Sequence, residues 1–132
     1  MRGVNGTMIT GMHHVSMNCG GAEDFERAKA FYCGVLGLLV RREWPGGVMI
    51  EAGNGLIELF SGGEAVRSKG AIRHFALAAD DVDRAVEAVR QAGCRIVMEP
   101  KDIVIESDPA YPARIAFFVG PLGEEIELFQ EL

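Results

Sequence analysis

Two glutamates occupy the same position in a four-residue phrase that the chain contains twice. The phrase is IELF, at residues 57–60 and again at residues 126–129. Alternation of branched and aromatic residues predicts a β-strand for each copy, with Glu58 and Glu127 on the face opposite Ile and Leu. An unpaired buried carboxylate is costly, so each Glu must either face solvent or meet a cation. The matching context of the two copies favours a cation.

A histidine stands at a matched position upstream of each glutamate. Residues 12–18 read MHHVSMN and residues 72–78 read IRHFALA. When the segments are aligned on His14 and His74, their large apolar residues coincide. The face that carries each His otherwise carries small or polar residues, which leaves space beside the imidazole. We therefore predict two modules, each beginning with a His strand and ending with a Glu strand.

The elements that position these side chains follow the order β-α-β-β-β twice. The first module, residues 12–61, is predicted to contain a strand at 12–19, a helix at 22–36, strands at 38–44 and 48–52, a tight turn at Asn54-Gly55 and the first Glu strand. Residues 62–70, rich in Gly and Ser, form a linker. The second module, residues 71–130, is predicted to contain a strand at 71–78, a helix at 82–92 capped by Asp80 or Asp81, strands at 94–98 and 114–119, and the last Glu strand. The proline-rich stretch 99–113 is expected to be mainly a surface loop, with room for a short strand at 103–105.

Composition narrows the class of protein. A chain of 132 residues is long enough for one domain with its own core. A net charge of −6 argues against nucleic acid or an anionic membrane as the main partner. No apolar run approaches a membrane span, and residues 1–10 lack the apolar region of a signal peptide. Cys19, Cys33 and Cys94 follow no metal or disulfide spacing, which favours free thiols and a cytoplasmic location.

At this point the chain resembles the vicinal oxygen chelate superfamily, which includes glyoxalase I, methylmalonyl-CoA epimerases, extradiol dioxygenases, and fosfomycin- and bleomycin-resistance proteins. The resemblance is carried by HHVSMN at 13–18, FYCGVLGLLV at 31–40, IELF at 57–60, RHFALAADDVDRAVEAVRQAG at 73–93 and GPLGEEIELFQ at 120–130. It implies a single α+β domain over residues 1–132, in which two paired βαβββ modules form a curved mixed sheet around an open metal-binding cleft. It also implies a homodimer, and in some members the site is shared between subunits.

The resemblance further implies a metal-ligand set, in the His/Glu/His/Glu order of glyoxalase I. The matching positions are His14, Glu58, His74 and Glu127. Two imidazoles with two carboxylates suit a divalent first-row ion (Ni, Zn, Co, Fe or Mn) better than Ca or Mg. Strand alternation turns His13 to the other face and excludes it from the set. Whether the two pairs meet within one chain or across a dimer is left open by the sequence.

Similarity to glyoxalase I implies a lyase or isomerase of the lactoylglutathione lyase type acting on a chelated small molecule. The metal would act as a Lewis acid, and Glu127 or Glu58 would move a proton between adjacent carbons. Asn18 stands where glutathione-dependent members usually have Arg, and Gly62 where they have Asn, which argues against glutathione as the thiol. The residues expected to contact substrate are Asn18 and the apolar wall Trp44, Phe60, Tyr111 and Phe129.

Other interpretations remain open. Arg67, Lys69 and Arg73, or Arg114, are candidates for anion recognition or simply solvated surface charges. An epimerase-like enzyme would also move a proton beside a carbonyl. Dioxygenase-like sites use two His and one Glu, so a fourth ligand at Glu58 counts against them. A non-catalytic binder of the bleomycin-resistance type would generally lack the full ligand set.

Overall fold

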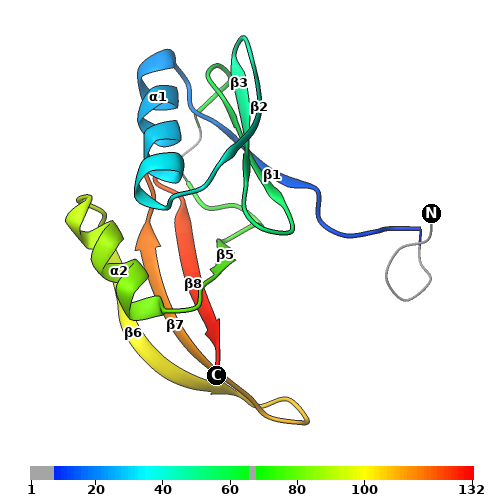
Figure 1. Ribbon diagram of the computed structural model, residues 1–132, viewed down its shortest axis with the longest axis vertical. Helices are drawn as coiled ribbons and strands as arrows, with labels where there is room; N and C mark the ends of the chain where they lie inside the picture. The colour runs from blue at the N-terminus through cyan, green and yellow to red at the C-terminus, as the bar shows by residue number, and fades with distance from the viewer. Residues whose placement is uncertain (1–7, 66–67) are drawn as a thin grey trace.

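The computed structural model describes residues 8–65 and 68–132, and it contains two βαβββ modules (Figure 1). The first comprises β1 (His14–Asn18), α1 (Ala22–Ala30), a π-helical turn η2 (Phe31–Val35), β2 (Val40–Trp44), β3 (Gly47–Glu51) and β4 (Leu56–Phe60). The second comprises β5 (Phe75–Ala78), α2 (Val82–Gln91), β6 (Ile96–Ile105), β7 (Tyr111–Val119) and β8 (Glu125–Glu131). The predicted α+β class and element order are confirmed. No helix in the described ranges is long and apolar enough to cross a membrane.

Each module builds its own four-stranded mixed sheet. The strand orders are β1-β4-β3-β2 and β5-β8-β7-β6. In both sheets the His strand lies parallel to the Glu strand, and the other pairs are antiparallel. The two sheets therefore have the same topology, and their parallel pairs set the positions of the candidate ligands.

One face of each sheet contributes apolar side chains to a single shared core. Val48, Ile50 and Leu59 from the first module are fully buried in the same cluster as Phe118 and Ile126 from the second. Helices α1 and α2 supply further members of this cluster, and both lie on the same side of the molecule (Figure 1). Because alternate strand residues fill the core, the residues between them, including His14, Glu58 and Glu127, lie on the other face of each sheet.

A partly buried polar contact also joins the modules. Tyr32, in η2, is fully buried, and its hydroxyl donates to Glu124 Oε2 at 2.7 Å in the turn before β8. Burial raises the pKa of Tyr32 well above its ordinary value, and the neighbouring Glu124 carboxylate acts in the same direction. The two modules are thus connected by a hydrogen bond as well as by apolar packing.

The helix boundaries follow the sequence signals closely. α1 and η2 together span residues 22–35, and Gly37 follows with a φ of 73°. This left-handed conformation suits glycine at a helix C-terminus. At the start of α2, the carboxylate of Asp81 accepts a hydrogen bond from the backbone N–H of Arg84, so Asp81 is the N-cap.

Three predictions of irregular structure or strand length are wrong in detail. The predicted loop 99–113 is mostly sheet, because β6 continues to Ile105 and β7 begins at Tyr111. Pro100 is tolerated because β6 is an edge strand and its register shifts between Met98 and Lys101. The turn at Asn54-Gly55 is part of a four-residue connection, residues 52–55, and β5 begins only after His74.

Candidate functional site

The first half-site is formed by His14 and Glu58 on adjacent parallel strands. In the register of β1 and β4, Glu58 lies opposite Ser16, one alternate position beyond His14 on the same face. This diagonal brings His14 Nε2 to 3.4 Å from Glu58 Oε1. Among the described residues, Glu58 is the only charged one that is buried. Its carboxylate is therefore held where a positive partner is needed.

The second half-site repeats this arrangement. Glu127 lies opposite Ala76 in the register of β5 and β8, and His74 immediately precedes β5. His74 Nε2 lies 3.2 Å from Glu127 Oε1. The His74 ring also packs edge-to-face against Phe117, with ring centroids 5.0 Å apart. Each module thus presents one imidazole nitrogen beside one carboxylate oxygen.

The donor separations fit a pair of ligands to one metal ion. Two donors about 2.1 Å from a first-row ion lie about 3.0–3.4 Å apart at angles between octahedral and tetrahedral. A charge-assisted hydrogen bond is shorter, about 2.7–2.9 Å. The observed separations of 3.4 and 3.2 Å fall within the range for two ligands of one ion. Imidazole with carboxylate is also the donor chemistry that divalent first-row ions accept.

The two half-sites do not come together within one chain. Across residues 8–65 and 68–132, no three His, Cys, Asp or Glu side chains form a group able to hold a metal ion. The structure therefore brings His14 to Glu58 and His74 to Glu127, but it does not unite the two pairs.

His13 lies beside the first half-site, in contact with the ring of His14. Its Nδ1 is 2.9 Å from His14 Nδ1, and the two rings meet edge-to-face. The prediction that His13 points to the other face is wrong because β1 begins at His14, so strand alternation does not govern the preceding residue. The His-His doublet was the only sequence signal of this contact.

The four predicted aromatic residues form one pair in each module, on the faces that carry Glu58 and Glu127. Trp44 and Phe60 have ring centroids 6.1 Å apart, and Tyr111 and Phe129 have centroids 6.0 Å apart. Gly47 pairs with both Trp44 and Phe60 in the sheet, and it has no side chain between them. The Tyr111 hydroxyl is hydrogen-bonded to Glu131, which raises its pKa.

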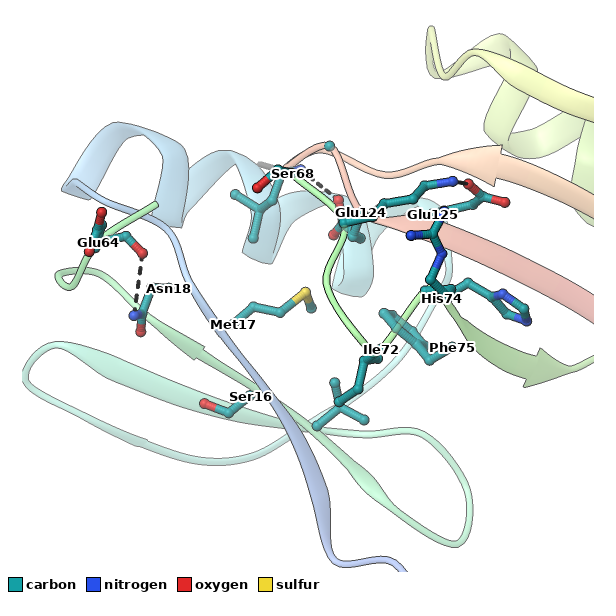
Figure 2. A pocket seen from close by; sticks show the side chains of 15 residues that line it. Ser16, Met17, Asn18, Glu64, Ser68, Ile72, His74, Phe75, Glu124 and Glu125 are labelled. Carbon is teal, nitrogen blue, oxygen red and sulfur yellow. Dashed lines mark hydrogen bonds and ion pairs between the residues drawn. The ribbon is translucent and has the colours of Figure 1, made fainter. Parts of the chain in front are cut away.

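Asn18 lines a cavity of about 420 Å³ between β1 and the segment that leads into β5. Its amide Nδ2 donates to the backbone carbonyl of Glu64 at 3.4 Å (Figure 2). His74 lies at the β5 edge of this cavity with its ring turned away from Met17 (Figure 2). The cavity lining includes neither Glu58 nor Glu127, so it is separate from the carboxylates of both half-sites.

The cations considered for anion recognition have different environments. Lys69 forms an ion pair with Glu125. Arg114 is held by Asp83 at 2.7 Å and by Asp102 at 2.9 Å, and its positive charge is thus already compensated. Arg73 lines the cavity beside His74, whereas Arg67 lies outside the described residues.

Comparisons with known proteins agree with this architecture. Residues 11–128 match the family model of the Glyoxalase/Bleomycin resistance protein/Dioxygenase superfamily. Uncharacterized protein YwkD of Bacillus subtilis (strain 168) is 31% identical, over 94% of this chain and 99% of its own.

Two solved structures share the fold at lower sequence identity. Lactoylglutathione lyase from Agrobacterium tumefaciens is 20% identical with a TM-score of 0.62, and the alignment covers 92% of this chain and 94% of that one. TnmS3, an antibiotic binding protein from Streptomyces sp. CB03234, is 22% identical with a TM-score of 0.69, covering 94% and 98%. With the family model matching most of its length, the chain belongs to the glyoxalase/bleomycin resistance protein/dioxygenase superfamily.

Proposed function

We propose that this protein is a metal-dependent, glyoxalase I-like lyase or isomerase that moves a proton on a chelated small-molecule substrate. The observation that carries the proposal is the repeated His–Glu pair, with donor separations of 3.4 and 3.2 Å in equivalent registers. Members of the superfamily generally use divalent metal ions. His14, Glu58, His74 and Glu127 would hold a Ni, Zn, Co, Fe or Mn ion.

The proposal requires the two pairs to meet, and a homodimer provides the means. His14 and Glu58 of one subunit would face His74 and Glu127 of the other, giving two equivalent sites related by a two-fold axis. Large apolar side chains near both pairs support this association. Met12 is 75% exposed two residues before His14, and Ile72 is 83% exposed two residues before His74. Exposed apolar surface beside a functional group commonly marks a protein interface.

The chemistry follows from what each side chain can do. A bound divalent ion supplies Lewis acidity toward adjacent oxygens of the substrate. Glu127 and Glu58 are the candidate proton carriers, because each largely buried carboxylate lies beside a histidine nitrogen. The carboxylate of Glu127, released from the ion, would accept a proton from one carbon and return it to the next. Glu58 could serve in the same role from the other half-site.

The substrate environment favours a thiol other than glutathione. Asn18 supplies a neutral amide, and its contact is with the Glu64 carbonyl. Losing a charge-assisted contact to a carboxylate costs about 1.5–3 kcal/mol. The Trp44–Phe60 and Tyr111–Phe129 pairs would instead provide apolar walls for the substrate. Cys19, Cys33 and Cys94 form no disulfide, which supports a cytoplasmic location.

The test combines metal analysis with turnover. Purified protein is loaded with Ni²⁺ or Zn²⁺ and assayed with methylglyoxal and a panel of small thiols, alongside Glu127→Gln. Bound metal, turnover by the wild type and a loss of at least about 10²-fold in Glu127→Gln would support the proposal. A protein that binds no divalent metal and turns over no substrate would overturn it. Epimerase-like and dioxygenase-like reactions are tested by extending the substrate panel.

A second candidate function is sequestration of a small molecule without chemistry. It is favoured by the aromatic pair in each module and by the shared fold with the antibiotic binding protein TnmS3. A planar apolar ligand would then quench the fluorescence of Trp44, the single tryptophan of the chain. Quenching by such a ligand in a metal-free, inert protein would favour this function over the lyase.

A further inference from the structure

The two half-sites match in their His–Glu geometry but differ in what lies behind each histidine. His14 Nδ1, the nitrogen that faces away from Glu58, is 2.9 Å from His13 Nδ1. The residue at the equivalent place in the second module is Arg73. Within the described parts of the chain, no hydrogen-bond partner is seen for His74 Nδ1, and its ring instead packs against Phe117. His14 is therefore in contact with a polar ring nitrogen on the side away from its glutamate, whereas His74 is in contact with an apolar ring.

A contact of 2.9 Å between two ring nitrogens is a hydrogen bond, and it needs one donor and one acceptor. A neutral imidazole carries a proton on only one of its nitrogens. If His14 gives the Nε2 lone pair to a metal ion, its proton must lie on Nδ1. His13 Nδ1 is then the acceptor, and the His13 proton lies on Nε2. The geometry thus assigns complementary tautomers to the two rings.

Resting on the proposed metal site, we infer that His13 is a positioning residue that fixes the tautomer and ring orientation of His14. The hydrogen bond holds Nε2 toward Glu58, so that the first half-site is prepared to bind a metal ion. In the described part of the chain, the second half-site has no equivalent polar contact at Nδ1, and the His74 ring packs against Phe117 on that side of the site. Loss of a hydrogen-bonding partner behind a metal-bound histidine typically weakens metal binding about 10- to 100-fold.

Three variants separate this role from a general structural one. His13→Leu removes the acceptor, and His13→Asn keeps an acceptor oxygen near the position of Nδ1. Arg73→Leu places leucine at the equivalent position of the second module. Zinc affinity is measured by competition with a chromophoric chelator, and the unfolding midpoint of each metal-free variant is measured in urea. ¹⁵N spectra of the imidazoles report the tautomers and any coupling across the Nδ1–Nδ1 hydrogen bond.

The inference predicts coupling between the two Nδ1 atoms in metal-free wild type and protonation of His14 on Nδ1 when zinc is bound. His13→Leu should bind zinc about 10- to 100-fold more weakly with an unchanged unfolding midpoint. His13→Asn should recover most of that affinity, and Arg73→Leu should not weaken zinc binding, because it removes a positive charge beside His74 and no hydrogen bond to that ring. Equal zinc affinity in wild type and His13→Leu would overturn the inference and leave the metal site standing. A wild type that binds no zinc would overturn the proposed function, and the role of His13 with it.

Discussion

At the scale of single residues, Gly47 decides how the aromatic pair of the first module is arranged. An ideal Cβ at this position would lie 2.3 Å from Cε2 and Cζ2 of Trp44, far inside van der Waals contact. The indole of Trp44 therefore lies across the backbone of β3 and meets Phe60 at a centroid distance of 6.1 Å. Any side chain at Gly47 would compete with the indole for the same space.

We predict that Gly47→Ala displaces Trp44 and destabilises the protein by about 1–3 kcal/mol, as overpacking usually does. Because Trp44 is the only tryptophan, its fluorescence reports the displacement directly. Urea unfolding followed by fluorescence measures both effects. Gly62→Ala is the matched control, since a Cβ there meets nothing within 4 Å. Equal spectra and stabilities for the two variants would contradict this account of Gly47.

At the scale of elements, the N-terminus of α2 is capped by one of two neighbouring aspartates. The sequence allowed either Asp80 or Asp81, and only Asp81 accepts the hydrogen bond from the Arg84 N–H. We predict that Asp81→Ala lowers the free energy of unfolding by about 0.5–2 kcal/mol. Asp80→Ala should leave it nearly unchanged. Chemical denaturation of both variants gives the comparison, and a larger loss in Asp80→Ala would refute the assignment.

The hydrogen bond between Tyr32 in η2 and Glu124 in the turn before β8 makes the free energy of unfolding depend on pH in the alkaline range. Burial and Glu124 raise the pKa of Tyr32 above that of an unfolded tyrosine, about 10. Above that pH the unfolded chain releases the proton while the folded protein keeps it. The folded state is therefore progressively destabilised as the pH rises. This stabilisation is fully present below about pH 10.

We predict that wild type loses stability more steeply than Tyr32→Phe when the pH rises above about 10. At neutral pH, Tyr32→Phe should cost about 1–3 kcal/mol, because the Glu124 carboxylate loses a hydrogen-bond donor. Tyr111→Phe is the comparison at a half-buried tyrosine whose pKa is also raised, by a hydrogen bond to Glu131. Unfolding midpoints measured across the alkaline range decide the matter, and parallel profiles for wild type and Tyr32→Phe would exclude this role.

Element boundaries show what a single sequence can and cannot determine. Helix α2 was predictable because its apolar residues, Val82, Val86 and Val89, recur at helical spacing and are all buried. The continuation of β6 through Pro100 was not, because it depends on a register shift against β7 and on the edge position of the strand. Neither feature is encoded in the local pattern of residues 99–113.

At the scale of the whole molecule, the same distinction applies to the candidate site. Each His–Glu pair was predictable from two short phrases, because a His at the start of one strand and a Glu on its parallel neighbour recur in both modules. Whether the two His–Glu pairs meet at one point depends on how the two sheets pack, either within one chain or between two subunits. Two equivalent phrases say nothing about that docking, and a single chain leaves the pairs apart.

Mixed dimers test whether two chains complete the site. If each site combines His14 of one subunit with His74 of the other, His14→Ala and His74→Ala homodimers each lack a full site. In a hybrid dimer of the two variants, one site has both wild-type histidines, and the other site has both alanines. Random exchange of subunits in an equal mixture should therefore recover about a quarter of the wild-type zinc binding and turnover. Sites formed within single chains would recover none, because every chain in the mixture carries a defect.

Co-expression with two different affinity tags isolates the hybrid, and a hybrid without bound zinc would rule out the shared arrangement.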